Sequence, residues 1–151
     1  LGGGVPIGAV VASPRYQDTF RPGDHGSTFA GGALACAAAL ATCHVLEDPA
    51  LQANVRRCGD RLRAGLRQLV DEGYAVDVRG RGLMVAIDLI GDGSAQRAVA
   101  HLLANRVLVN NTSDRTLRFL PPLVITEEQI DLVLDAVRAA VVAGRHGETV
   151  A

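Results

Sequence analysis

The sequence predicts an α/β chain in two parts: the end of a larger domain, residues 1–48, followed by a small α+β domain, residues 49–144. In residues 49–144, segments with helical spacing of apolar residues alternate with strand-like segments, which is typical of helices layered on a sheet. Residues 1–48 hold one strand-like and one helix-like segment, too little to close a core. We expect residues 145–151 to be a tail. Because the chain lacks an initiator Met, we interpret it as part of a longer protein.

Charge and composition exclude several classes of protein. The 151 residues include 15 basic and 16 acidic ones, and neither sign forms a block, so we expect no nucleic-acid partner. The sequence contains no run of the ~20 consecutive apolar residues that a membrane-spanning helix needs, so we expect no membrane partner. All the basic residues are arginines, and the chain therefore contains no lysine.

The three cysteines, Cys36, Cys43 and Cys58, fall in helix-like segments without CxxC spacing. We interpret them as small buried apolar groups, which fits a reducing, cytoplasmic location. No spacing of Cys, His, Asp or Glu predicts a metal site.

The first half of the chain is predicted to contain a strand, a loop and two helices. Residues 7–13 are small and apolar between a glycine cluster and a proline, which favours a short buried strand, and residues 14–28 favour a loop. Residues 31–47 are apolar on nearly all sides, which predicts a helix packed within protein. Asp48 is expected to cap the next helix, which ends at Gly73. The apolar residues of that helix recur every three or four positions: Leu51, Val55, Cys58, Leu62, Leu66 and Leu69.

The second half is predicted to contain four strands and two helices. Two strands flank Gly80 and Gly82, and further strands are expected over residues 107–110 and 116–120. The residues expected on the inward face of the first two strands are Val76, Val78, Leu83, Val85, Ile87 and Leu89.

Ser94 is expected to cap a helix that runs to Asn105. Thr126 and Gln129 form a capping-box pattern at the start of the last helix, which runs to Gly144. Its expected buried stripe is Ile130, Val133, Leu134, Val137 and Val141. This order of elements predicts an antiparallel or mixed sheet with helices on one side.

Three places in the sequence offer groups that could bind a ligand. The loop at residues 25–29, HGSTF, precedes a helix, so the Ser27 and Thr28 hydroxyls could complete an anion site or could simply cap the helix. Arg118 is the one charge in an apolar run, and either a substrate carboxylate or an internal partner such as Asp88 would match its guanidinium. The glycines at residues 2–4 allow close approach of a phosphate or a tight turn. The acidic residues show no pairing that indicates a general acid and base.

Four stretches in fixed order resemble one family: residues 1–9 (LGGGVPIGA), 25–29 (HGSTF), 79–84 (RGRGLM) and 117–123 (LRFLPPL). Together they resemble the C-terminal part of the class III pyridoxal-phosphate-dependent aminotransferases. The HGSTF stretch is most similar to the acetylornithine and ornithine aminotransferase branch. The resemblance covers essentially the whole chain.

The resemblance implies the fold type I of pyridoxal-phosphate-dependent transferases and a homodimer with active sites at the subunit interface. It also implies pyridoxal 5'-phosphate as cofactor, held as a Schiff base by a lysine two positions before the residue that matches Leu1. Since the chain has no lysine, we expect it to supply no catalytic residue and to be inactive alone.

By the same resemblance, Thr28 would bind the cofactor phosphate of the neighbouring subunit's site, and Ser27 would contact the substrate. Arg118 matches the arginine that binds the substrate α-carboxylate. Arg79 and Arg81 are interpreted as structural. After the HGSTF stretch the family usually has Gly-Gly-Asn-Pro-Leu, whereas this chain has AGGAL at residues 30–34, which weakens the expected junction between loop and helix.

The implied function is transamination between N-acetylornithine and 2-oxoglutarate in arginine biosynthesis, so the expected partners are a small amino donor and a 2-oxo acid. Two alternatives stay open. One is a non-catalytic module of this fold that acts through oligomerisation or binding, and the other is a class III aminotransferase that acts on another ω-amine.

Overall fold

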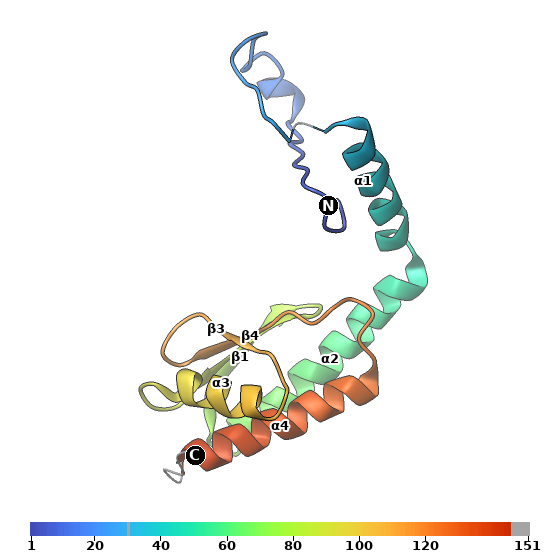
Figure 1. The fold of residues 1–151 in the computed structure, drawn as a ribbon. Coiled ribbons are helices and arrows are strands. Elements are labelled where there is room, and N and C mark those ends of the chain that lie inside the picture. Colours follow the sequence, from blue (N-terminus) through green and yellow to red (C-terminus); the bar gives the residue numbers. More distant parts are fainter. Residues whose placement is uncertain (30, 146–151) are drawn as a thin grey trace. The chain divides into compact units, whose positions relative to one another are not determined.

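The computed structural model describes residues 1–29 and 31–145, and of Arg145 only the backbone. The chain divides into two units, Leu1–Pro49 and Ala50–Ala151, and each is described here by itself (Figure 1).

The first unit contains one turn of 3-10 helix, η1 (Pro14–Tyr16), and one α-helix, α1 (Ala33–Leu46). The helix predicted over residues 31–47 is therefore confirmed. The strand predicted over residues 7–13 is wrong: these residues form no regular structure, and Val10 and Val11 are almost fully exposed. An extended segment becomes a strand only when a neighbouring strand takes up its backbone hydrogen bonds, and among the described residues none does so.

Helix α1 exposes most of its apolar side chains. Ala39 is its one buried residue, whereas Leu34, Leu40 and Val45 are exposed, so the expectation of a helix packed within protein is not met by the described residues. The cysteine prediction is wrong for Cys36, which is exposed because it lies on this uncovered helix. Cys43 is half-buried.

Helix α2 (Pro49–Asp71) has one buried face, as its spacing predicts. Leu62, Leu66 and Leu69 are at most 2% exposed. The helix ends in a paired hydrogen-bond arrangement in which the Tyr74 N–H donates to Leu69 O at 2.8 Å and the Gly73 N–H donates to Val70 O at 2.9 Å. Gly73 has φ +74°, a conformation that glycine adopts without a steric penalty. The predicted stop at this glycine is confirmed.

A four-stranded sheet follows, in the order β1 (Ala75–Arg81), β2 (Met84–Leu89), β4 (Thr116–Phe119), β3 (Asn110–Asn111). All neighbouring strands are antiparallel. Helix α3 (Ser94–Ala104) connects β2 to β3. The strand predicted over residues 107–110 is largely wrong, because only the short segment Asn110–Asn111 pairs with β4 at the sheet edge.

The alternation of β2 and β4 separates the two faces of the sheet. Val85, Ile87 and Leu117 are buried on the inner face. Val76 departs from the predicted inward pattern: it is 65% exposed, whereas Ala75 is buried. The pairing of β1 with β2 shifts register between Ala75 and Asp77, and such a bulge turns one side chain away from the face that its position predicts.

Helix α3 begins differently from the prediction. Its N-cap is Gly93, at φ +66°, and Ser94 is the first helical residue rather than the cap. The Ser94 hydroxyl is buried and has no hydrogen-bond partner among the described residues.

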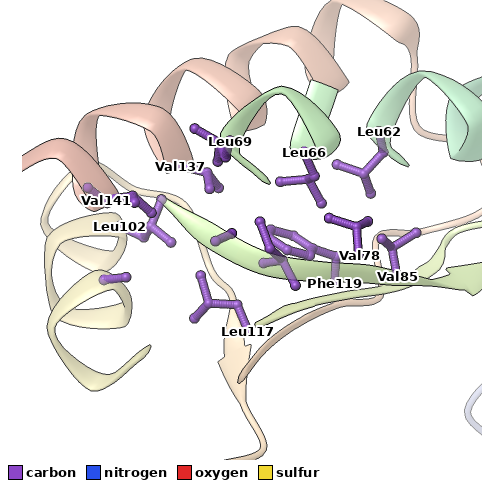
Figure 2. Packing of buried hydrophobic residues seen from close by; sticks show 14 of the residues in the cluster. Leu62, Leu66, Leu69, Val78, Val85, Leu102, Leu117, Phe119, Val137 and Val141 are labelled. Carbon is purple, nitrogen blue, oxygen red and sulfur yellow. The ribbon is translucent and has the colours of Figure 1, made fainter. Parts of the chain in front are cut away.

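The core lies between the inner face of the sheet and helices α2, α3 and α4 (Glu127–Arg145) (Figure 2). The predicted capping box of α4 is confirmed, since the Thr126 N–H donates to Gln129 Oε1 at 3.0 Å and the Gln129 N–H donates to Thr126 Oγ1 at 3.3 Å. The expected arrangement of helices on one side of an antiparallel sheet is therefore observed. Helix α4 includes Arg145, and the rest of the expected tail, 146–151, lies outside the described residues.

Among the described residues, no single helix is long and apolar enough to cross a membrane. Helices α1 and α2 reach the required length and composition only as a pair, broken at residues 47–48.

Candidate functional site

The loop at residues 25–29 belongs to the first unit and is fully accessible. Ser27 Oγ accepts the Phe29 N–H at 3.2 Å, which leaves the proton of this hydroxyl free to be donated. The Thr28 side chain is exposed and makes no hydrogen bond to any described residue. The ring centroid of His25 lies 6.0 Å from that of Phe20.

The alternative that this loop caps the following helix is wrong. The N-cap of α1 is Gly32, which has no side chain to accept a hydrogen bond, and Ser27 and Thr28 lie several residues before it. Gly32 and Ala33 thus leave the start of α1 without a side-chain cap. Ala30 lies outside the described residues.

The glycines at residues 2–4 form a tight turn. The Val5 N–H donates to Gly2 O at 3.0 Å, and Gly3 and Gly4 have φ of +59° and +112°. Of the two interpretations left open for this cluster, the turn is the one observed.

Arg118 lies in the second unit, near the centre of β4. Its neighbours Leu117 and Phe119 point into the core, so Arg118 projects from the opposite, outer face and is exposed. Although its run is otherwise apolar, Arg118 is not buried, because the alternation of the strand turns this position away from the core. Arg118 makes no ion pair with any described residue.

The internal partner considered for Arg118 is engaged elsewhere. Asp88 binds the guanidinium of Arg79 through two contacts, Nη1 to Oδ2 at 2.5 Å and Nη2 to Oδ1 at 3.1 Å. The Thr116 hydroxyl donates to Asp88 Oδ1 at 2.7 Å. The guanidinium of Arg79 and this hydroxyl hold the pKa of Asp88 below its usual range, against the opposing effect of partial burial.

This network was missed by sequence reasoning, although a signal for it existed. In a hairpin the outward positions of β1 and β2 lie beside one another, and Arg79 and Asp88 both occupy such positions. Two further acidic residues have partners of other kinds: Asp92 contacts Arg115 at 3.5 Å, and Asp114 accepts from Gln96 at 2.8 Å. Within the described ranges no group of three or more His, Cys, Asp or Glu residues could hold a metal ion.

Arg118 also borders a cavity of about 650 Å³ in the second unit. Most of its wall is apolar and comes from α2, α4 and the segments on both sides of β4, including Leu62, Phe119, Ile125 and Ile130. An exposed guanidinium that has no ion pair with any described residue suits a ligand that carries a carboxylate.

The structure places the sequence-predicted residues in both units. Ser27 and Thr28 lie in the first and Arg118 in the second. Each group is accessible within its own unit, and each has hydrogen-bonding capacity that the described residues do not use.

Comparison with known proteins gives consistent matches. The family model described as aminotransferase class-III matches residues 1–141. An acetylornithine aminotransferase of Methanothermobacter thermautotrophicus is 44% identical over 136 residues, which are 89% of this chain and 34% of that protein. Ornithine aminotransferase 2 of Staphylococcus aureus is 42% identical over 139 residues, which are 91% of this chain and 34% of that protein.

Among solved structures, an ornithine aminotransferase from Toxoplasma gondii matches with a TM-score of 0.75 and 34% identity, over 85% of this chain and 31% of that one. That structure is described as having partial occupancy of PLP at the protein active site. The chain thus spans about a third of the length of the relatives that it matches.

Proposed function

This chain belongs to the class III aminotransferase family, and from that premise we propose that it is the C-terminal part of an acetylornithine aminotransferase. The predicted family and fold are confirmed: the structural neighbours are pyridoxal-phosphate-dependent aminotransferases, and the chain matches a part of their fold. The proposed reaction is transfer of an amino group between N-acetylornithine and 2-oxoglutarate, a step of arginine biosynthesis. The names of the relatives at 42–44% identity support this branch.

The observation that carries the proposal is the unpaired Arg118 on the outer face of the sheet. In this role its planar guanidinium binds the α-carboxylate of the substrate through two parallel hydrogen bonds. The backbone of β4, paired on both sides by β2 and β3, fixes the position from which the side chain extends. Arg118 would therefore orient the substrate rather than move a proton.

The loop at residues 25–29 fits the phosphate of pyridoxal phosphate. A phosphate group offers only acceptor oxygens to its neighbours, and the exposed Thr28 hydroxyl has a proton to donate that no described residue takes up. We assign Thr28 to the cofactor phosphate and Ser27 to the substrate. In a homodimer, the arrangement that we propose for the complete enzyme, Thr28 would serve the site of the neighbouring subunit.

Bound pyridoxal phosphate supplies an electron sink for removal of a proton beside the amino group. The lysine that must hold it covalently is not in this chain, which contains none. We therefore propose that the chain alone is inactive. The test is to mix it with pyridoxal phosphate, reduce with borohydride and map the peptides by mass spectrometry. No internal adduct is expected, and an adduct at any residue other than the terminal amine would contradict this assignment.

The role of Arg118 is tested in the complete aminotransferase that contains this chain, with Arg118→Met and Arg118→Lys. Loss of a charge-assisted bidentate pair is expected to raise KM for both carboxylate substrates roughly 10- to 100-fold. The Lys variant keeps the charge without the planar fork and should recover part of the loss. Both variants should unfold at the wild-type temperature, because Arg118 is exposed and unpaired. An unchanged KM in the Met variant would reject the assignment.

A second candidate substrate is ornithine, because relatives named for it match this chain almost as well as those named for acetylornithine. Turnover of N-acetylornithine and ornithine by the complete enzyme separates the two. A kcat/KM that is higher for ornithine, or for another ω-amine, would replace acetylornithine in the proposal. The three free cysteines support a cytoplasmic location.

A further inference from the structure

Two neighbouring rows on the outer face of the sheet carry charged side chains. In the register of the strands, Arg79 lies opposite Ala86, and Ala86 lies opposite Arg118. In the next row, Asp77 lies opposite Asp88, which in turn lies opposite Thr116. Two arginines therefore flank one small residue, and a carboxylate lies one row away from both.

This register makes Asp88 a diagonal neighbour of Arg118 across β2 and β4. Diagonal side chains on one face begin about 7–8 Å apart, a gap that a long arginine and a carboxylate can bridge. Asp88 could thus neutralise Arg118. It does not do so in this structure, since Arg79 occupies both of its oxygens.

Asp88 is held on several sides. The hydroxyl of Thr116 donates to one oxygen of Asp88, and Ser113 Oγ in turn donates to Thr116 Oγ1 at 2.8 Å. Asp77 is a second acceptor for Arg79, at 3.2 Å, which keeps the guanidinium over β1 and β2. Together these contacts keep the charge of Asp88 on the side of Arg79.

We propose that Arg79 is a positioning residue of the carboxylate site, which holds Asp88 and thereby leaves Arg118 free for the substrate carboxylate. This inference rests on the function proposed for Arg118. In this proposal Arg79 acts on the substrate site only through Asp88, since Arg79 itself need not touch the substrate.

Removal of Arg79 has a definite consequence in this geometry. Asp88 would keep its bond to Thr116 but lose its cation. Arg115 acts on it only through space and already contacts Asp92. Arg118 is then the free guanidinium within diagonal reach, so the two would pair, and an incoming carboxylate would have to displace Asp88.

The first test measures how readily Arg118 reacts with phenylglyoxal, which modifies free guanidinium groups, with the peptides quantified by mass spectrometry. The test uses this chain and needs no substrate. Arg79→Met should slow modification of Arg118 roughly fivefold, the scale of one exposed ion pair. The double variant Arg79→Met/Asp88→Asn should restore the wild-type rate, because it removes the competing carboxylate.

The matched control is Arg138→Met, which removes a similar two-contact pair, 2.6 and 2.8 Å long, between α4 and Glu72, the residue that follows α2. It should leave modification of Arg118 unchanged. If Arg79→Met and Arg138→Met have the same effect on Arg118, general loss of stability is the cause and the proposal is wrong. The proposal is also wrong if the double variant Arg79→Met/Asp88→Asn does not recover the wild-type rate of Arg118 modification.

The second test measures KM in the complete aminotransferase. Arg79→Met should raise KM for the carboxylate substrates roughly fivefold with little change in kcat, and Asp88→Asn in the same protein should reverse this. The two assignments fail in different ways. If Arg118→Met leaves KM unchanged, the function assigned to Arg118 fails; if Arg118→Met raises KM but Arg79→Met does not, only the positioning role fails.

Discussion

At the residue scale, Gly59 and Gly144 are both helical glycines but have opposite surroundings. A Cβ at Gly59 would lie 2.2 Å from Gly82 O, in the turn between β1 and β2, whereas a Cβ at Gly144 meets no atom of the described residues within 4 Å. Gly59 therefore allows α2 to approach the hairpin directly. Gly82 is itself constrained, since it has φ +54°.

The Gly59→Ala substitution should lower the free energy of unfolding by about 1–3 kcal/mol, because a rigid backbone carbonyl must move. Gly144→Ala is the matched control and should raise the free energy of unfolding by about 0.5–1 kcal/mol, the ordinary gain of alanine over glycine in a helix. Urea titration of the two variants beside the wild type measures both. Equal effects of the two substitutions would mean that the close approach at Gly59 is not maintained.

Arg118 shows what a residue type reveals and what it does not. A single charge in an apolar run marked this position in the sequence as one that needs a partner. The same run did not show that Arg118 is exposed. Adjacent residues in a strand face opposite sides, so apolar neighbours do not tell on which face of the sheet the charged side chain lies. Pairing of β4 with β2 and β3 decides that face.

At the element scale, α2 and α4 are joined along their exposed sides by ion pairs. Arg61 contacts Asp131 at 2.6 and 2.7 Å, and Arg138 contacts Glu72 at 2.6 and 2.8 Å. Hydrogen bonds from these arginines hold the pKa values of Asp131 and Glu72 below their ordinary values of 3.8 and 4.5. A carboxylate with a lowered pKa stabilises the fold above its unfolded pKa and loses that contribution as the pH falls through the folded pKa.

We therefore expect the Asp131→Asn variant to unfold at a lower urea concentration than the wild type at pH 7, and the difference to shrink as the pH falls through the lowered pKa of Asp131. Below that pKa the wild-type carboxyl is also neutral. Asp135→Asn, on the same helix, is the control. Asp135 forms no salt bridge with any described residue, so this substitution should change the urea concentration of unfolding little at pH 7. A difference that grows as the pH falls would contradict the role of this ion pair.

The elements that sequence patterns predicted well are those whose ends are determined locally. Gly73 ends α2, and Thr126 with Gln129 begins α4, through hydrogen bonds within a few residues. The predictions that failed, over residues 7–13 and 107–110, concern strands. A strand depends on a partner distant in sequence, and local apolar composition cannot supply one.

At the scale of the whole molecule, the two units differ in how many apolar side chains they bury. The entire buried cluster of the described residues belongs to the second unit, whereas Ala39 is the one buried apolar side chain of the first. Amide hydrogen exchange should accordingly show strong protection in β2, β4 and the buried faces of α2 and α4, and weak protection throughout residues 1–48.

This exchange measurement is made on the monomeric chain, with its association state checked by sedimentation. Equal protection of the two units in a monomer would contradict the expectation. The exposed apolar side chains of α1, including Leu34 and Leu40, also predict self-association at higher protein concentration.

By itself, the sequence determined the family, the helices, two strands around Gly80 and Gly82 in an antiparallel or mixed sheet, and the three candidate residues Ser27, Thr28 and Arg118. Local hydrogen bonding, apolar periodicity and ordered motifs are properties of neighbouring residues, so they can be read along the chain. Only the tertiary structure decided that Arg118 is exposed and that Asp88 belongs to Arg79. Those facts depend on strand register, which brings residues from three strands side by side and which no local pattern specifies.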